Sequence, residues 1–389
     1  MTEQFALVTD TFLGNPSQYS GVEASDMIGG AEVNLYRIGQ ILLDEGHEVT
    51  VYQQDTGNPN DEYDGIEIEY LSTVGSGTAE LLSFNLQWQR VVSQDEIVYV
   101  HSPEYAIPNL RPVDALNQQG ITWDVPSSRN LTTRVKRYFL GRLLSKKSLV
   151  RCTDNAFLTY VQSEHPTARN NVFPIPNGVD TTVFSPDVDP INSPTNSTME
   201  ETVVLFPRTL RLARGAHLIV DTLAKLRSKG HDVSLWFLGA ENITDASLVR
   251  SQIERNNLAN AVEFLGHVPH EEMPRYYAAA DIVSIPTYHS EGTSLSCLEA
   301  MACGRPVVVT DVGGLKEIIY QDEVDGGFKV KPTAEALAPA VEKLVEDPVL
   351  RGRLGENARR RVVDYFTLER WEQQMREFFR TVSERRGQN

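Results

Sequence analysis

Residues 285–317 read IPTYHSEGTSLSCLEAMACGRPVVVTDVGGLKE. The stretch follows an apolar segment, passes through a loop that contains Gly292, continues as a helix-like run, and ends in the apolar residues 307–309. A strand, a loop, a helix, a turn and a strand within about thirty residues form one βαβ unit. Two carboxylates, Glu291 and Glu299, bracket the loop and the start of the helix, and we place Glu299 about two turns into that helix.

The same alternation of short apolar segments and amphipathic helical patterns extends along both halves of the chain. The expected strands are residues 5–8, 48–52, 66–71, 96–100, 149–152, 172–175, 203–206, 233–239, 262–266, 282–285 and 307–309. Helical patterns lie between most of them, and three more close the chain at residues 334–346, 348–364 and 368–383. This order predicts an α/β protein of two Rossmann-like, doubly wound domains that face a central cleft.

The length of 389 residues also indicates two domains, because one ordinary core does not grow to that size. Residues 185–200, SPDVDPINSPTNSTME, contain three prolines and many Ser, Thr and Asn, a composition typical of a linker. We therefore expect an N-terminal domain, a linker, a C-terminal domain and a final helix, at residues 1–184, 185–200, 201–365 and 366–389.

The formal net charge of −17 argues against a nucleic-acid partner. It fits either an ordinary acidic protein or a protein of a high-salt cytosol, and we favour the halophilic interpretation because salt screens self-repulsion. The N-terminus lacks the pattern of a signal peptide and no apolar run is long enough to span a membrane, so we expect a cytoplasmic protein. Cys152, Cys297 and Cys303 are expected as buried small hydrophobic residues rather than as disulfides or metal ligands.

Residues 129–151 contain eight Lys and Arg and no acidic residue. Apolar side chains such as Leu131, Val135 and Tyr138 interleave with them at near-helical spacing. A basic amphipathic helix of this kind predicts peripheral contact with an anionic membrane, on its inner face, or with a lipid phosphate. The alternative is a packed helix whose basic side balances nearby acids.

Two features of the first half point to a ligand. Gly29 and Gly30 open a helix, where free N–H groups favour an anion, although a tight turn that needs the torsions of glycine explains the pair equally well. His101 follows the strand at 96–100, and the carboxyl ends of parallel strands line the ligand crevice.

The second half gathers the residues of a pyrophosphate site. Arg208 stands at a strand end, Arg214 precedes a helix, and the amides of Thr293, Ser294 and Leu295 lie at a helix start. The carboxylates of Glu291 and Glu299 suit sugar or ribose hydroxyls, so the set predicts a nucleotide-sugar site. These residues include no Asp-x-Asp motif, and the arginines and the helix dipole can carry the charge of a leaving group, so we expect no metal or other cofactor.

The stretch from Glu291 to Glu317, with its paired glutamates and the run AMACGRPVV, resembles the signature of the retaining glycosyltransferases of family 4. The runs GGAE at 29–32, GHEVTV at 46–51, IPNGVD at 175–180 and FLGHV at 264–268 are similar to other motifs of that family. The resemblance extends over nearly the whole chain and implies the two-domain, glycogen-phosphorylase-like fold known as GT-B.

The resemblance implies a role for each candidate residue. Arg208 and Arg214 would hold the donor phosphates, Glu291 would contact the donor sugar near its reacting carbon, and Glu299 would bind the ribose. Thr293, Ser294 and Leu295 would offer amides to sugar and phosphate, Gly29 and Gly30 would line the first-domain side of the cleft, and His101 would lie near the catalytic centre. The last helix, around Trp371, would cross back onto the first domain.

The sequence departs from the family pattern in three places. Arg214 stands in place of a lysine of the family, at a spacing from Arg208 that is one residue longer. The run Gly292-Thr293-Ser294 replaces Gly-Phe-Gly. The segment that follows His101 matches poorly, with Trp123-Asp124 as the counterpart of the family's His-Asp. These departures concern which sugar and which acceptor are bound.

The resemblance therefore implies a metal-independent hexosyltransferase that moves a sugar, with retention, from a nucleotide diphosphate sugar to an acceptor. A lipid-linked acceptor or a growing glycan, in polysaccharide or glycoprotein assembly, is the acceptor class that we expect. A nucleotide-sugar epimerase or a phosphorylase on the same fold, and a catalytically silent sugar-nucleotide-binding protein, stay open as alternatives.

Overall fold

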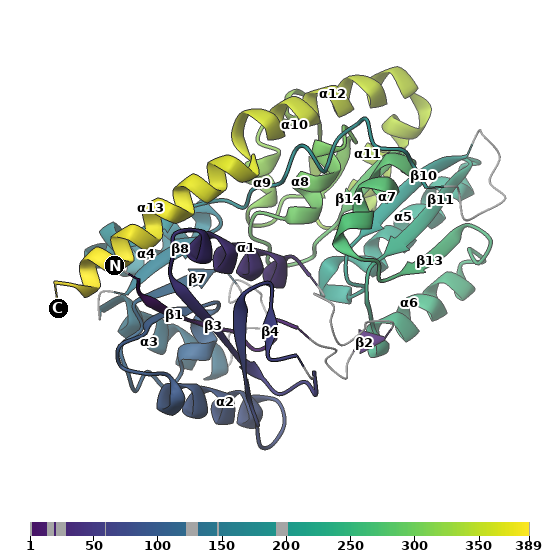
Figure 1. Ribbon diagram of the computed structural model, residues 1–389. Helices are drawn as coiled ribbons and strands as arrows, with labels where there is room; N and C mark the ends of the chain where they lie inside the picture. The colour runs from purple at the N-terminus through teal and green to yellow at the C-terminus, as the bar shows by residue number, and fades with distance from the viewer. Residues whose placement is uncertain are drawn as a thin grey trace. The chain divides into compact units, whose positions relative to one another are not determined.

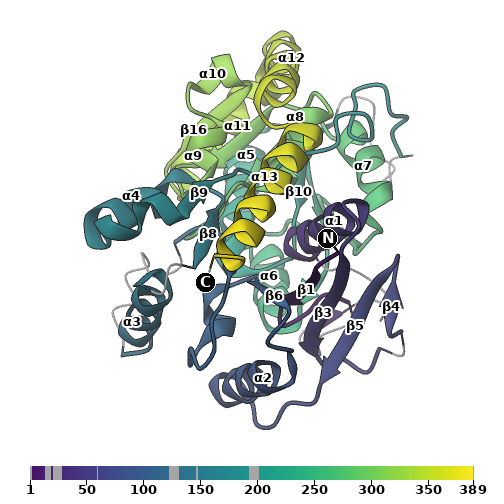
Figure 2. The same ribbon diagram turned by 60° about the vertical axis from the view of Figure 1, so that its left-hand side comes forward.

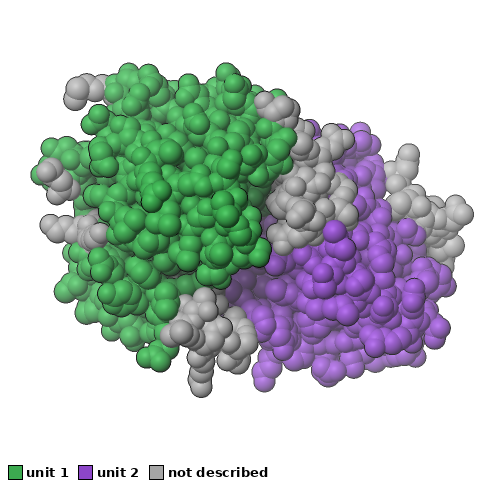
Figure 3. Space-filling model, turned by 90° about the horizontal axis from the view of Figure 1, so that it is seen from below, with its two compact units in different colours: residues 1–16, 23–176, 371–389 green, residues 17–22, 177–370 purple. Residues whose placement is uncertain are grey.

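The computed structural model describes residues 2–13, 19–20, 29–58, 60–121, 131–145, 148–191 and 201–388. The chain divides into two compact units, coloured separately in Figure 3. Unit 1 comprises residues 1–16, 23–176 and 371–389, and unit 2 comprises residues 17–22 and 177–370. Each unit is an α/β domain built around its own sheet.

Among its described residues, unit 1 contains an eight-stranded sheet in the order β4-β5-β3-β1-β6-β7-β8-β9. All neighbouring strands are parallel except β4, which is antiparallel to β5. The strands are β1 (Gln4–Val8), β3 (Glu48–Gln54), β4 (Glu62–Tyr63), β5 (Ile66–Leu71), β6 (Ile97–Val100), β7 (Ala115–Gln118), β8 (Leu149–Cys152) and β9 (Val172–Pro174). The helices are α1 (Gly30–Asp44), α2 (Thr78–Val91), α3 (Leu131–Ser145), α4 (Asn155–Glu164) and α13 (Leu368–Arg386).

The final helix, α13, packs on the strands of unit 1 (Figures 1 and 2). Its Phe379 contacts Phe5 of β1 edge to face, with ring centroids 5.7 Å apart. Trp371 lies against the guanidinium group of Arg151, which is buried on β8. Unit 1 therefore draws its core from both ends of the chain.

Unit 2 has a six-stranded parallel sheet, counted over its described residues, in the order β13-β11-β10-β14-β15-β16. The strands are β10 (Thr202–Pro207), β11 (Val233–Leu238), β13 (Val262–Gly266), β14 (Ile282–Ile285), β15 (Val307–Thr310) and β16 (Gly327–Val330). This is the doubly wound order in which the direction of winding reverses between β10 and β14, and ligands bind at the carboxyl ends of the strands at such a point.

Helices cover both faces of this sheet. They are α5 (Ala216–Ser228), α6 (Ile243–Arg255), α7 (Met273–Ala279), α8 (Leu295–Ala302), α9 (Leu315–Ile318), α10 (Asp322–Asp325), α11 (Ala334–Glu346) and α12 (Pro348–Tyr365). Alternate residues of β10 enter different cores: Val204 and Phe206 pack in one cluster, and Val203 and Leu205 in the other. A strand buried on both faces explains why β10 is an unbroken apolar run. A short antiparallel ladder joins β2 (Tyr19–Ser20) to β12 (Glu241–Asn242).

The expected strands are all present, and the expected α/β fold is confirmed. Strands β7 and β16 were not expected from the sequence, because their runs ALNQ and GFKV have few β-branched residues. Helix α6 starts at Ile243, where the Asn242 side chain caps the amide of Asp245.

The chain passes from unit 1 to unit 2 at Pro176, so residues 177–184 lie in unit 2, although we had assigned them to the N-terminal domain. Residues 192–200 of the expected linker lie outside the described residues.

Candidate active site

Arg208 directly follows β10, beside the point where the winding of the unit 2 sheet reverses. Its side chain is only 7% exposed. The guanidinium group donates to the Thr287 hydroxyl and, over 2.6 Å, to Oε2 of Glu291. A buried cation is therefore held at the carboxyl edge of the sheet by a paired carboxylate.

Glu291 is bound by three groups through one oxygen, Oε2. Besides Arg208, Arg214 donates over 2.7 Å and the Thr287 hydroxyl lies 2.9 Å away. Burial alone would raise the pKa of Glu291, but the charges of Arg208 and Arg214 outweigh it and lower that pKa to about 2. The carboxylate is thus ionised at any physiological pH, while its Oε1 takes no part in these three contacts.

Two glycines allow the backbone to approach closely enough to build this cluster. Gly215 has φ +86°, and a Cβ there would lie 1.9 Å from the carbonyl oxygen of Pro286. Gly313 has φ +49°, and a Cβ there would lie 1.9 Å from the carbonyl oxygen of Glu291. Only glycine fits either position, so the Gly-Gly pair after β15 sets the backbone of the loop that carries Glu291.

The N-terminus of α8 opens next to this loop. Ser294 is its N-cap residue, and the Ser294 hydroxyl is buried without a hydrogen-bond partner in the part of the chain that the structure describes. The Asn177 side chain donates to the carbonyl oxygen of Thr293 over 2.6 Å and so holds the start of the helix. Buried donors at a helix N-terminus suit an anion.

Glu299 is the fifth residue of α8, about one turn from its start rather than the two turns that we expected. The carboxylate is buried and held on both sides. Nε2 of His270 lies 2.8 Å from Oε1, and the Tyr277 hydroxyl donates to Oε2 over 2.8 Å. Burial, followed by the charge of Glu299, raises the pKa of Tyr277 well above its usual value, so the hydroxyl stays protonated as a donor.

Three residues of this set were missed by the sequence analysis: Asn177, His270 and Tyr277. Asn177 was noted only within the run IPNGVD at 175–180, and its contact spans 116 residues of sequence. Tyr277 and His270 reach Glu299 across 22 and 29 residues. No local pattern indicates such pairs.

In unit 1, Gly29 is the N-cap residue of α1, and Gly30 is the first residue of that helix. Gly29 has φ −158°, an extended conformation that any residue adopts. Gly30 is not among the positive-φ glycines either, so the tight-turn explanation for this pair is wrong. A Cβ at Gly29 would lie 3.3 Å from a carboxylate oxygen of Glu32, which places that carboxylate at the start of α1.

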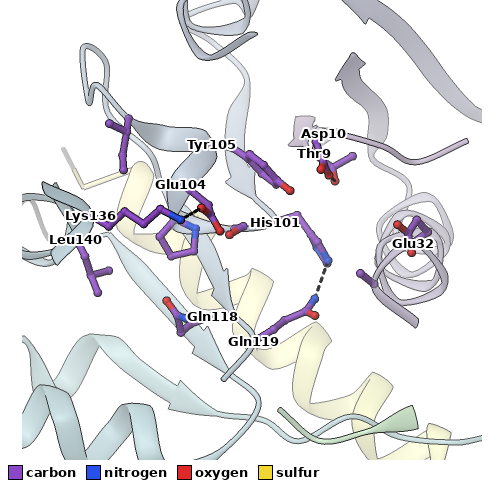
Figure 4. A pocket seen from close by; sticks show the side chains of 14 residues that line it. Thr9, Asp10, Glu32, His101, Glu104, Tyr105, Gln118, Gln119, Lys136 and Leu140 are labelled. Atoms are coloured by element: carbon purple, nitrogen blue, oxygen red, sulfur yellow. Dashed lines mark hydrogen bonds and ion pairs between the residues drawn. The ribbon is translucent and has the colours of Figure 1, made fainter. Parts of the chain in front are cut away.

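His101 follows β6 and lines a cavity of about 200 Å³ in unit 1 (Figure 4). The side chain is buried, and its Nε2 lies 2.8 Å from Nε2 of Gln119. Burial, with a smaller effect from the Arg151 charge, lowers the pKa of His101 to about 3. The imidazole is therefore neutral near pH 7.

The basic segment is only partly described, because Arg129, Lys146 and Lys147 lie outside the described residues, as does the pair Trp123-Asp124. On α3, Arg134, Arg137 and Arg142 are exposed. Lys136 is paired with Glu104 and Arg137 with Glu164, as the charge-balance alternative requires.

Arg151 is fully buried on β8, where it donates to the carbonyl oxygen of Ile175 and to Asn117. Its inclusion in a membrane-binding surface was wrong, since the strand takes it into the core. No helix in the described ranges is both long and apolar enough to cross a membrane.

The three cysteines are buried and free, as expected. Within the described ranges, one group has the spacing of metal ligands: His231, Glu342 and Glu346. Lys229 donates to both oxygens of Glu342, which explains that group as an ion-pair network. The chain contains an Asp-x-Asp triplet at residues 187–189, and both of its aspartates are exposed.

Comparison with known sequences gives a match of residues 187–361 to the family described as glycosyl transferases group 1. A D-inositol 3-phosphate glycosyltransferase of Arthrobacter sp. (strain FB24) is 33% identical over 189 residues, which are 47% of this chain and 44% of that protein. The enzyme of the same name from Xylanimonas cellulosilytica is 27% identical over 264 residues, 61% of this chain and 62% of that protein. The chain thus spans less than two thirds of the length of either relative.

Solved structures superimpose on nearly the whole chain. A sucrose-phosphate synthase from Thermosynechococcus elongatus superimposes with a TM-score of 0.79 at 21% identity, covering 98% of this chain and 99% of that one. Anabaena Alr3699/HepE, solved in complex with UDP and glucose, gives a TM-score of 0.72 at 20% identity, covering 97% and 99%. These likenesses confirm the predicted GT-B fold class.

Proposed function

We propose that the chain, whose residues 187–361 match the family of group 1 glycosyl transferases, transfers a hexosyl group from a nucleotide diphosphate sugar to an acceptor hydroxyl, with retention. The observation that carries this proposal is the cluster of Arg208, Arg214 and Glu291 beside the N-terminus of α8. Two guanidinium groups and one carboxylate leave one positive charge, at the edge of a doubly wound sheet where ligands bind.

The diphosphate of the donor binds to this positive cluster. The Arg214 side chain is 38% exposed and donates to Glu291 through Nη1, so the other N–H groups of this guanidinium can bind phosphate oxygens. Arg208, which is buried, keeps Glu291 in place. The amides of Thr293, Ser294 and Leu295 supply the donors of a helix N-terminus, and Gly29 and Gly30 stay candidate donor-binding residues of unit 1.

Glu291 and Glu299 bind the two sugar rings of the donor. Oε1 of Glu291 accepts a hydrogen bond from a hydroxyl of the transferred hexose, near the anomeric carbon of that sugar. Tyr277 and His270 orient Glu299, whose carboxylate accepts hydrogen bonds from the ribose hydroxyls. His101, which is neutral near pH 7, stays a candidate catalytic residue of unit 1.

In the transfer, the acceptor oxygen bonds to the anomeric carbon on the face from which the diphosphate departs. The bond between that carbon and the phosphate oxygen breaks, and the acceptor proton passes to an oxygen of the leaving diphosphate. The products are a glycoside and a nucleoside diphosphate. Arg208, Arg214 and the α8 dipole stabilise the charge that develops on the leaving group, so we assign that task to no metal.

The first donor to test is UDP-glucose, because Alr3699/HepE has been solved in complex with it. Calorimetric titration with UDP and with GDP measures nucleotide binding, and a screen of UDP- and GDP-sugars measures release of the diphosphate. We expect one nucleotide to bind, and Arg208→Ala to weaken its binding and to lower turnover together.

Three results would contradict the proposal. Failure to bind either nucleotide would indicate a protein without a donor site. Conversion of a donor sugar without any acceptor would indicate an epimerase, and a requirement for inorganic phosphate would indicate a phosphorylase.

A further inference from the structure

The cavity of unit 1 lies where a doubly wound domain binds ligands. Thr9 and Asp10 follow β1, His101 follows β6, and Gln119 follows β7, so the cavity opens at the carboxyl ends of neighbouring parallel strands. Its volume of about 200 Å³ is several times the roughly 30 Å³ that one water molecule occupies in the liquid. The space suits one monosaccharide ring.

The charged side chains that line the cavity are mostly acidic. In the described lining they are Asp10, Glu32, Glu104 and Lys136. Lys136 pairs with Glu104 (Figure 4), so its charge is already matched within the cavity wall. Glu32 lies in the first turn of α1, where it supplies the negative charge that a helix N-terminus favours. An anionic ligand would therefore meet carboxylates in this cavity.

Several polar groups that line the cavity can accept hydrogen bonds. The Tyr105 hydroxyl is hydrogen-bonded to Asp10, which leaves further acceptor positions on that carboxylate. Oε1 of Gln118 is buried without a partner in the described part of the chain, while its Nε2 donates to the carbonyl of Gly120. Acceptors of this kind match the hydroxyl donors of a sugar or polyol.

Apolar side chains complete the wall. Ile107 and Leu140 line the cavity together with the ring of Tyr105. The C–H face of a sugar ring packs on such a surface, while its hydroxyls turn to the acceptors. Each part of the wall thus fits the same kind of ligand.

We infer that this cavity binds the acceptor of the transferase as an uncharged, hydroxyl-rich group, a sugar ring or polyol, and disfavours a phosphorylated one. The inference rests on the proposed function, because it identifies the cavity ligand with the acceptor. It assigns Asp10 and Glu32 to acceptor binding and selection.

The test uses matched pairs of acceptors with the full-length protein and its best donor. Each pair is a neutral compound and its phosphate ester: glucose and glucose 6-phosphate, myo-inositol and inositol 3-phosphate, glycerol and glycerol 3-phosphate. Release of nucleoside diphosphate above the acceptor-free rate is the readout. We expect at least one neutral member to stimulate release, with a kcat/KM about tenfold or more above that of its ester. Equal or better use of the esters, or no stimulation by any neutral member, would overturn the inference.

Substitution distinguishes charge selection from a structural role. The double variant Asp10→Asn, Glu32→Gln should raise the KM of the neutral acceptor about tenfold and narrow the gap between the neutral compound and its ester. The matched control Glu69→Gln removes an exposed carboxylate of β5 and should leave both values unchanged. An unchanged gap in the double variant would contradict the inference.

UDP or GDP titration separates this inference from the proposed function. Loss of nucleotide binding in the wild type would refute the transferase itself. Intact nucleotide binding with the wrong acceptor preference would refute only the assignment of the cavity.

Discussion

At the scale of single residues, the chemistry of unit 2 centres on the buried carboxylate of Glu291. Two arginines hold it ionised by contacts to Oε2. A glutamine at this position would keep the shape of the side chain but lose the charge that orders both guanidinium groups. Its loss should therefore affect both catalysis and stability.

We predict that Glu291→Gln lowers kcat by about 100-fold or more but changes the dissociation constant of the donor by less than about fivefold. An amide oxygen can still accept from Arg208, but it does not stabilise the positive charge that develops at the anomeric carbon. Steady-state kinetics and calorimetric titration with the donor measure the two quantities. Near-wild-type kcat would remove Glu291 from the reaction centre.

The low pKa of Glu291 also predicts how stability depends on pH. Because this pKa is depressed from 4.5 to about 2 in the folded state, its contribution is fully present above pH 4.5. The contribution is lost as the pH falls from 4.5 towards 2, and it is on the order of 3 kcal/mol. We expect Glu291→Gln to lower the melting temperature at pH 7, with a difference from wild type that shrinks below pH 4.5. A constant difference across this range would contradict the assignment.

At the scale of secondary-structure elements, contacts between distant segments place the groups that we propose bind the donor. Tyr277 on α7 orients Glu299 on α8, and Asn177 holds the loop in front of α8. The apolar strands, the two arginines and the paired glutamates were predictable, because each belongs to a local pattern of sequence. Tyr277 and Asn177 were not, because their contacts form only when distant segments pack together.

We predict that Tyr277→Phe weakens UDP binding about three- to tenfold, since the hydrogen bond from the Tyr277 hydroxyl, which with His270 orients Glu299, is lost. The adjacent Tyr276→Phe serves as the matched control and should bind UDP as the wild type does. Titration calorimetry measures both variants. Equal affinities would mean that Glu299 needs no orientation by α7.

Helix α3 offers a test of the membrane proposal. Val135 and Tyr138 are 41% and 62% exposed, and Arg134 and Arg142 are exposed beside them. We propose that this face contacts anionic lipid, and we predict that the protein floats with phosphatidylglycerol vesicles but not with neutral ones. Arg134→Glu with Tyr138→Ser should abolish flotation, and Arg360→Glu on α12 should not. Absence of flotation by the wild type would favour the charge-balance explanation of α3.

At the scale of the whole molecule, charge and fold set different properties. The two doubly wound sheets follow from the alternation of apolar runs and amphipathic helices. The net charge of −17 instead affects how the stability of the fold depends on salt concentration. The unit boundary at Pro176 escaped the sequence analysis because the proline-rich segment after Phe184 gave the stronger linker signal.

We propose that the protein is adapted to high salt, and we predict that its melting temperature rises as KCl increases from 0.2 M towards molar concentrations. Screening of repulsion between carboxylates is the physical cause. Differential scanning calorimetry at several KCl concentrations measures the effect, with equimolar sucrose as a control for non-ionic stabilisation. Full stability below about 0.2 M KCl would contradict the proposal.

The return of α13 to unit 1 bears on how the protein is synthesised. Val179, on the way into unit 2, exchanges backbone hydrogen bonds with Phe366 and Leu368, on the way out, so the two crossings lie side by side. Residues 177–370, the main part of unit 2, are thus inserted into the chain of unit 1, and the two ends of this segment are adjacent. On the ribosome, the inserted segment is complete before its host, because Phe379 leaves the exit tunnel after residue 370 and is needed beside Phe5. The first domain to begin is the last to finish, and a nascent chain must keep the N-terminal sheet from aggregating until its closing helix arrives.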